Sequence, residues 1–426
     1  MDKSDERYGC YVAILEEELV CAMGCTEPIA IAYAAARARE LLGARPDRLA
    51  VSACGSIIKN VKSVIVPNTG HLKGMEAAVA AGIIAGSAEK ELEVISEVSE
   101  EKKSAIRDYL QTVPITIEHT EQGHVFDIVV TERCGQDYAR VRIADYHTNI
   151  CRIEKNGTVL YEVPLLDETV QEDARADRSL LNMQDIWDFA ETADLRDVAD
   201  LLERQIRYNN AIAEEGLLGD YGANIGRVLL TTYGNDVSNR AKAKAAAGSD
   251  ARMNGCELPV IINSGSGNQG ITCSVPLIEY AKELHSGKEK LYRALIISNL
   301  VAIHEKTGIG TLSAYCGAVS AGAGAGAGIV YLCGDGYQAA IHTVVNALAI
   351  VSGIVCDGAK ASCAAKIASS VDAALLGYNM YKCNQEFKGG DGIVMKDIET
   401  TIKGIGRLGK DGMRQTNEEI IRLMMS

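Results

Sequence analysis

The pattern of hydrophobic and polar positions changes twice along this chain of 426 residues. Residues 11–43 carry apolar side chains at helical spacing, and Gly43 is a typical stop signal. Between Leu49 and Val163 the pattern becomes one of short runs rich in β-branched residues. From about Asp185 onward helical spacing returns. The chain is therefore expected to combine a helical part with a strand-rich part.

The strand-rich part contains seven strand candidates and one helical candidate, GMEAAVAAGIIAG. The strand candidates are LAVSACG, SVIVPN, VPITIEHT, HVFDIVVTE, ARVRIADYH, NICRIE and TVLYEV. Asn156-Gly157 predicts a tight hairpin turn between the last two. We predict an α+β fold with a mainly α-helical domain, residues 1–48 and 190–426, that is interrupted by an inserted α+β domain, residues 49–189.

Two long stretches, residues 308–334 and 337–356, contain no Asp, Glu, Lys or Arg. Each is long enough to cross a bilayer, so a membrane transporter is one alternative interpretation. However, the first is dominated by Gly and Ala, the second contains His342 and Asn346, and the mean hydropathy of the chain is +0.01. We expect both stretches to form helices buried inside a helical domain, without a membrane partner.

The overall charge and the cysteine content narrow the class of partner. A formal net charge of −14 argues against nucleic acid or an anionic membrane surface, because both attract basic patches. A small molecule is the expected partner. Thirteen cysteines behind a charged N-terminus favour a reducing cytoplasm, where thiols serve as metal ligands or nucleophiles. The Gly/Ala-rich C-terminal half has few charges and is compatible with a homodimer interface.

Three cysteines near the C-terminus, Cys316, Cys356 and Cys363, lie among small residues. Free cysteine often packs as a small hydrophobe, which is the plain alternative. The segment DGAK between the last two brings charge and glycine into an apolar run, and glycine lets backbone approach a bulky inorganic group. The pattern favours three ligands of an iron-sulfur cluster. Three thiolates leave one iron open to act as a Lewis acid on a small substrate.

A second candidate site is Cys25, in GCTEP just before an apolar helix. A thiol at a helix N-terminus is stabilised as the thiolate, so we expect a pKa near neutrality and a role as acid, base or nucleophile. In the alternative interpretation Thr26 is the N-cap, Glu27 is a favourable first-turn charge and Cys25 only packs.

Further polar candidates are spread along the chain. The loop NSGSGNQG at residues 263–270 has the glycines and amides of a nest for a carboxylate or phosphate. His71 and His147 follow predicted strands, where a side chain can enter a cleft or serve structure alone. Lys59-Asn60 is either a carboxylate binder or a solvated strand edge.

Three of these segments together resemble one known family. GCTEPIAIA at residues 24–32, NSGSGNQG, and CDGAKASCAAK at residues 356–366 resemble the superfamily of L-cysteine desulfidases and iron-sulfur L-serine dehydratases, nearly from end to end. The resemblance implies a 4Fe-4S cluster held by three cysteines, with one open iron. The positions that match its ligands are Cys316, Cys356 and Cys363.

The resemblance also implies an activity. It is the β-elimination of L-cysteine to pyruvate, ammonia and sulfide, with L-serine dehydration by the same cluster as the alternative. Cys25 matches the cysteine of that family that acts in proton transfer, and His71 and His147 are carried over as further catalytic residues. The residues expected to bind the substrate are Thr26, Glu27, Lys59, Asn60, Gly267 and Asn268.

Two rival interpretations belong to other classes. A pyridoxal-phosphate lyase performs the same overall reaction, but no lysine stands out as its Schiff-base residue and the three cysteines would have no role. A non-enzymatic iron-sulfur sensor would leave Cys25 and the loop at residues 263–270 without a task.

Overall fold

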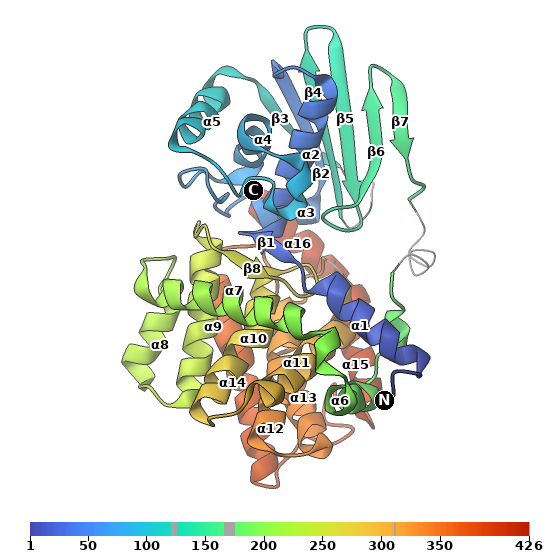
Figure 1. The fold of residues 1–426 in the computed structure, drawn as a ribbon, viewed down its shortest axis with the longest axis vertical. Helices are drawn as coiled ribbons and strands as arrows, with labels where there is room; N and C mark the ends of the chain where they lie inside the picture. The colour runs from blue at the N-terminus through green and yellow to red at the C-terminus, as the bar shows by residue number, and fades with distance from the viewer. Residues whose placement is uncertain (121–123, 125, 166–174, 311, 426) are drawn as a thin grey trace.

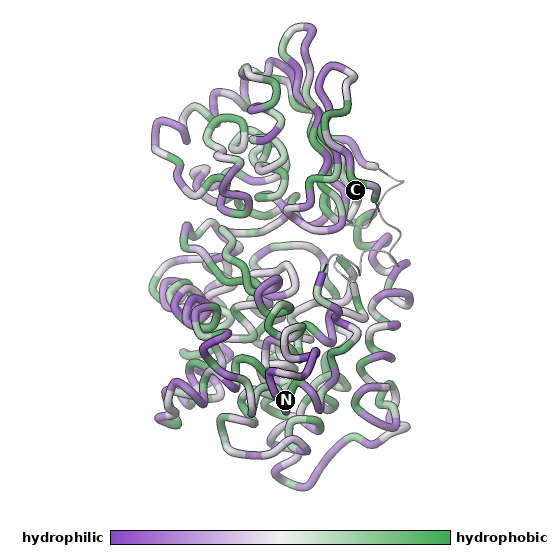
Figure 2. The backbone as a smooth tube through the Cα atoms, turned by 45° about the vertical axis from the view of Figure 1, so that its right-hand side comes forward, coloured by the Kyte–Doolittle hydropathy of each residue, from purple (hydrophilic) through white to green (hydrophobic). Residues whose placement is uncertain are grey.

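The computed structural model describes residues 1–120, 124, 126–165, 175–310 and 312–425. A twisted sheet with its helices forms one part, and a larger set of helices forms the other (Figure 1). This arrangement confirms the predicted α+β fold class. Hydrophobic segments run through the interior of both parts, and hydrophilic segments mark many of the outer turns (Figure 2).

The main sheet has six strands in the order β3-β2-β4-β5-β6-β7. Their bounds are β2 (Arg48–Cys54), β3 (Ile115–Thr120), β4 (Asp127–Cys134), β5 (Asp137–Ala144), β6 (Ile150–Lys155) and β7 (Thr158–Glu162). β2 and β3 are parallel and all other pairs are antiparallel. The parallel pair requires a crossover, which α3 (Gly55–Val61), α4 (Gly74–Ala85) and α5 (Glu100–Thr112) provide. The hairpin at Asn156-Gly157 is confirmed, with φ of 49° and 83°.

Helix α2 (Thr26–Leu42) packs on this sheet against β4 and β5, and it also packs on α4. Gly82 of α4 allows that contact, because a Cβ there would lie 2.2 Å from the carbonyl oxygen of Ala32. The sequence analysis grouped residues 1–48 with the helical part, whereas the contacts of α2 run to the sheet. The proposed domain bounds stay a prediction.

Most of the remaining helices form the second part. They are α1 (Glu6–Glu18), α6 (Met183–Thr192), α7 (Ala199–Leu218), α8 (Ile225–Tyr233), α9 (Val237–Met253), α10 (Gly267–Glu283), α11 (Lys288–Ile309), α12 (Gly317–Cys333), α13 (Tyr337–Val351), α14 (Ser362–Lys382), α15 (Ile398–Arg407) and α16 (Arg414–Met425). The last of these, α16, packs against α3 of the sheet part.

The charge-free stretches form α12 and α13, and both are largely buried among other helices, as predicted. α12 packs against α10, α11, α13 and α14. Its glycines permit this close packing, because a Cβ at Gly324 would lie 2.4 Å from the carbonyl oxygen of Ser298. Among the described residues, no helix is both long enough and apolar enough to span a bilayer.

The helical run of residues 11–43 forms two helices, and α2 begins directly after Cys25, as the sequence analysis placed it. The short strand β1 (Cys21–Met23) between α1 and α2 was not predicted, and one predicted strand is wrong. The run SVIVPN forms no strand beyond one isolated bridge at Ile65, since Asn68 turns the chain with a φ of 59°.

Candidate active site

The N-terminal segment and the loop at residues 263–270 are brought together by a two-stranded sheet. β1 pairs antiparallel with β8 (Pro259–Ile261), with Cys21 opposite Ile261. As a result the start of α2 lies beside the loop, and Thr26 Oγ1 donates to the carbonyl oxygen of Gly265 at 3.0 Å. Two motifs that are more than 230 residues apart therefore share one site.

Cys25 is the N-cap of α2 and is 2% exposed. Its Sγ donates to Glu27 Oε2 at 3.0 Å. Burial and the Glu27 carboxylate raise the pKa of Cys25 well above its ordinary value. The predicted lowering of this pKa to near neutrality is therefore wrong: desolvation and a neighbouring negative charge outweigh the helix N-terminus.

The carboxylate of Glu27 is held by several donors. Asn60 Nδ2 donates to Oε1 at 2.8 Å, and Thr26 Oγ1 lies 3.2 Å from Oε2. Burial acts to raise the pKa of Glu27, but His147, Cys25 and Asn60 more than offset it, so the pKa is lowered. Glu27 is accordingly an ionised acceptor beside a protonated thiol.

Lys59 and Asn60 lie on α3 and are buried, which excludes the solvated strand edge considered above. Lys59 Nζ donates to the carbonyl oxygen of Cys356 at 3.2 Å and to Asn417 Oδ1 at 2.8 Å. α3 thus links the Glu27 network to the cysteine segment.

The two predicted histidines have different surroundings. His147 is buried with its ring against Phe126, 4.7 Å between centroids, and its Nε2 has no hydrogen-bond partner within the described part of the chain. Burial lowers the pKa of His147, which favours the neutral imidazole. His71 is exposed on a loop with a φ of 68°, and its ring lies near Gly255. The structure brings His147 to the Glu27 network and leaves His71 at the surface.

The three C-terminal cysteines lie on two chain segments that run side by side. Cys316 is the N-cap of α12, and its N–H donates to Ile354; the N–H of Cys356 donates back to Ala314 at 2.6 Å. Cys363 lies in the first turn of α14. All three side chains are half-buried.

The electrostatics of these thiols place them in one site. Burial is the main cause that raises the pKa of Cys316 to about 12, and the neighbouring Cys356 adds to it. Both causes also raise the pKa of Cys363. Within the described ranges, no three Cys, His, Asp or Glu side chains are grouped closely enough to hold a single metal ion. A multi-iron cluster is larger than one ion and needs more widely spaced thiolates, so three thiols within electrostatic range of one another fit such a group.

Cys25 forms a small buried apolar cluster with Val64 and Met253, and Cys363 packs against this cluster. The cluster brings the Cys25–Glu27 pair close to the three cysteines. The two strongest candidate sites of the sequence are thus two halves of one site.

The loop at residues 263–270 is fixed by a buried amide network. Asn263 Nδ2 donates to Asn299 Oδ1 at 3.0 Å, and Asn299 exchanges hydrogen bonds with Gln205. Gly267 and Asn268 open α10, and Asn268 Oδ1 is buried without a partner among the described residues. The loop therefore presents the N-terminus of α10 to the site.

Two polar residues of this site, Arg252 and Lys306, were not predicted from the sequence, whereas Gln269 belongs to the predicted loop at residues 263–270. Arg252 and Lys306 are isolated cations near the ends of helices, and only their burial reveals them. Burial lowers the pKa of Lys306 to about 8, while Cys356 and Cys316 act in the opposite direction. Gln269 packs against Gly317. A Cβ added at Gly317 would lie 2.6 Å from the side-chain amide carbon of Gln269.

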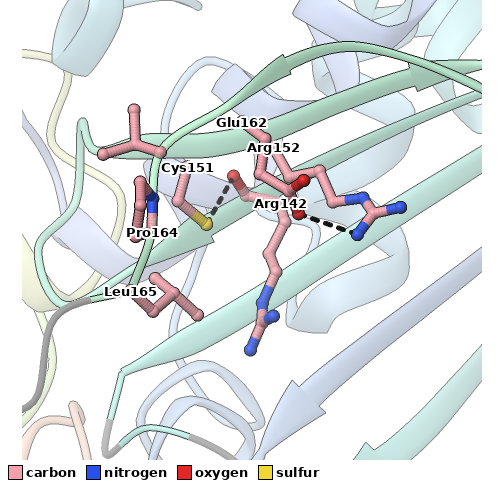
Figure 3. Close-up of a pocket in the computed structure, with 7 residues that line it drawn as sticks. Arg142, Cys151, Arg152, Glu162, Pro164 and Leu165 are labelled. Atoms are coloured by element: carbon pink, nitrogen blue, oxygen red, sulfur yellow. Dashed lines mark hydrogen bonds and ion pairs between the residues drawn. The ribbon is translucent and has the colours of Figure 1, made fainter.

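A cavity of about 770 Å³ reaches the site, and its wall includes His147, Gly265 and Lys306. A second cavity, about 430 Å³, lies against β5, β6 and β7 (Figure 3). Its two cations are already paired: Arg142 with Asp127, and Arg152 Nη1 with Glu162 Oε1 at 2.9 Å. The larger cavity is the better candidate for access of a small substrate.

Comparisons with known proteins give one consistent result. The sequence model of the serine dehydratase alpha chain family matches residues 89–422. A UPF0597 protein of Desulfitobacterium hafniense is 59% identical over 100% of this chain and 99% of its own length. UPF0597 proteins of Lachnoclostridium phytofermentans and Treponema denticola are 52% and 47% identical, over 98% and 100% of this chain and 100% and 99% of their own lengths.

Proposed function

Because this chain belongs to the serine dehydratase alpha chain family, we propose that it is an iron-sulfur-dependent lyase that converts L-cysteine to pyruvate, ammonia and sulfide. The observation that carries the proposal is the packing of Cys363 against the small apolar cluster that contains Cys25, which brings a proton-transfer pair close to a group of three thiols. Neither half alone is sufficient for an elimination, which needs both a proton acceptor and activation of the leaving group.

Cys316, Cys356 and Cys363 would hold the iron-sulfur group. When bound, this group supplies Lewis-acid stabilisation of the leaving sulfur of the substrate. Lys306 and Lys366 lie within electrostatic range of these cysteines and favour their thiolate forms. The ligand assignment rests on the family resemblance and on the electrostatic influence of Cys356 on both Cys316 and Cys363.

The hydrogen-bonded pair of Cys25 and Glu27 would move the protons. With the proton on Sγ, Cys25 is an acid that can protonate the departing sulfide. With the proton moved to Glu27, the thiolate is a base that can accept the α-proton of the substrate. His147, neutral and with a free Nε2, can accept a hydrogen bond from the substrate.

The reaction balances without an oxidant. The Cα–H and Cβ–S bonds break, a Cα=Cβ bond forms, and sulfide leaves with the bonding electrons. The aminoacrylate takes a proton at Cβ, becomes an imine, and is hydrolysed by one water molecule to pyruvate and ammonia. Thr26, Asn60 and the first residues of α10, Gly267 and Asn268, would position the substrate.

The test is a product assay on anaerobically reconstituted protein. Wild type should release sulfide and pyruvate in equal amounts from L-cysteine, whereas Cys25→Ala should keep its iron and lose at least about 100-fold in turnover, the range of general acid–base catalysis. Cys10→Ala is the matched control, because Cys10 lies on α1 and is not one of the proposed site residues. This variant should behave as wild type. Full activity in Cys25→Ala would contradict the role of this residue.

L-serine dehydration is the second candidate, and the family description itself favours it. Serine and cysteine differ by one atom at the leaving group, so the same residues would serve both. Pyruvate from L-serine without sulfide release from L-cysteine would establish this alternative.

A further inference from the structure

Arg252 lies near the end of α9 and is 2% exposed. Its Nε is buried without a hydrogen-bond partner within the described part of the chain. A buried guanidinium N–H without a hydrogen bond is costly, because it has lost its contact with water and has no acceptor in exchange. The arrangement is expected where an anionic ligand completes the site.

The surroundings of Arg252 identify the place of that ligand. Arg252 lies within electrostatic range of Cys25, Glu27 and Cys363, which are the residues of the proposed proton transfer and metal binding. An anion bound by this guanidinium would therefore lie beside the reacting groups.

The first turn of α10 meets the guanidinium from the other side. A Cβ at Gly267 would lie 2.3 Å from Arg252 Nε and 2.8 Å from its Cζ, so the absence of a side chain at Gly267 makes room for the guanidinium. Ser266 is the N-cap of α10, and its side chain makes no capping hydrogen bond. The first amides of this 17-residue helix are thus left for a ligand.

We propose that Arg252 and the N-terminus of α10 bind the α-carboxylate of the amino-acid substrate. This inference rests on the proposed function, and it assigns the carboxylate to a residue other than Lys59. Lys59 Nζ already donates to Cys356 and Asn417, so the contacts of its ammonium are internal. The planar fork of arginine can hold a carboxylate by two parallel hydrogen bonds and so fix the orientation of Cα.

The experiment uses two thiol probes that differ in the group of interest. 3-Mercaptopropionate carries a carboxylate and no amine, whereas cysteamine carries an amine and no carboxylate. Binding of each to the reconstituted holoenzyme is measured by calorimetry, for wild type, Arg252→Gln and Arg252→Lys, with iron content determined for every sample. The matched control is Arg293→Gln on α11, because the Arg293 side chain is also largely buried, at 16% exposed, but has internal partners at Ala190, Glu191 and Glu289.

In Arg252→Gln we expect 3-mercaptopropionate to bind roughly 10- to 100-fold more weakly, the range for a hydrogen-bonded charged group, with cysteamine binding and iron content unchanged. KM for L-cysteine should rise by a similar factor. The affinity of Arg252→Lys for 3-mercaptopropionate should lie between those of Arg252→Gln and wild type, because lysine keeps the positive charge and loses the forked guanidinium. Unchanged 3-mercaptopropionate binding, or an equal loss for both probes, would overturn the assignment.

Gly267→Ala gives an independent test in which the arginine itself is not replaced. A Cβ at this position would lie 2.3 Å from Arg252 Nε and would shift the guanidinium, so the same selective loss of 3-mercaptopropionate binding is expected. The proposed function can fail separately: if wild type turns over neither L-cysteine nor L-serine, that function is wrong, while the two probes still decide whether Arg252 binds a carboxylate.

Discussion

Several buried polar atoms without partners among the described residues lie around the candidate active site, and others lie elsewhere, as at Glu132 and Glu305. Asn60 Oδ1, His147 Nε2, Arg252 Nε and Asn268 Oδ1 are all buried at the candidate active site without a hydrogen bond within the described ranges. A folded protein normally satisfies such atoms, since each unsatisfied one costs about 1–3 kcal/mol. Their convergence on the Cys25–Glu27 pair is the residue-scale argument for a polar, zwitterionic ligand.

Asp250 provides a residue-scale prediction that is independent of function. It is 1% exposed, and burial raises its pKa from 3.8 to about 6, although the backbone N–H groups of Ile225 and its neighbours oppose this. The folded state therefore holds the proton more tightly than the unfolded state. The resulting stabilisation is fully present below about pH 4 and is lost as the pH rises through about 6.

A shift of this size is worth about 3 kcal/mol. Asp250→Asn cannot titrate, so the unfolding free energy of wild type relative to this variant should fall by about that amount between pH 4 and pH 7.5. Urea unfolding at both pH values measures this. Asp220→Asn, whose side chain is 90% exposed, is the control and should show no such difference. The same difference in both variants would refute the prediction.

At this scale the sequence was informative about thiols and uninformative about cations. Cys25 and the three C-terminal cysteines stand out by their local motifs, and GCTEP and NSGSGNQG could be linked to one family. Arg252 and Lys306 have no local signal, because a single cation within a helix is ordinarily solvent-exposed. The direction of the shift in the Cys25 pKa could not be predicted from the sequence either, because it depends on burial and on Glu27.

At the scale of elements, α12 shows how glycine can be required inside a helix. Glycine in a helix interior ordinarily costs about 1 kcal/mol relative to alanine. In α12 that cost is offset by close packing against α11 and α14, where no side chain would fit at Gly322 or Gly324 without a shift of backbone. The N-cap of this helix is Cys316, so its packing also positions a proposed ligand.

Two Gly→Ala substitutions separate these effects. Gly324→Ala should destabilise the protein by about 1–3 kcal/mol, because its Cβ would lie 2.4 Å from the carbonyl oxygen of Ser298. Gly9→Ala in α1 has no heavy atom within 4 Å of the new Cβ and should stabilise by up to about 1 kcal/mol. Denaturant unfolding of the two variants measures both. Stabilisation by Gly324→Ala would show that the packing of α12 is looser than described.

Element types were largely predictable, whereas the breaks between elements were not. The strands from β2 to β7 and the buried α12 and α13 follow from periodicity and turn chemistry. The strand β1 between α1 and α2 was not predicted, because it depends on pairing with β8, a contact between residues about 240 positions apart. A strand edge was the alternative considered for Lys59 and Asn60, because a seven-residue helix leaves almost no periodic signal.

At the scale of the whole molecule, the N-terminal, middle and C-terminal thirds of the chain all contribute residues to the site. Glu27 and Asn60 come from the sheet part, the α10 loop from the middle, and the thiols from the C-terminal helices. α16 completes the assembly from the far end, since Asn417 accepts from Lys59 and Ile421 packs against Gly55. A site built across both parts is expected to form only when the whole chain is folded.

The central claim is that Cys316, Cys356 and Cys363 hold an iron-sulfur group on which the lyase reaction depends. The most direct measurement is the count of iron and acid-labile sulfide after anaerobic reconstitution, made on wild type, on each single Cys→Ser variant of the three, and on Cys383→Ser as an exposed control. We predict about four irons and four acid-labile sulfides per chain in wild type and in the control. The three variants should lose iron and should no longer release sulfide from L-cysteine. Iron content that is absent in wild type, or unaffected by replacing these three cysteines, would contradict it.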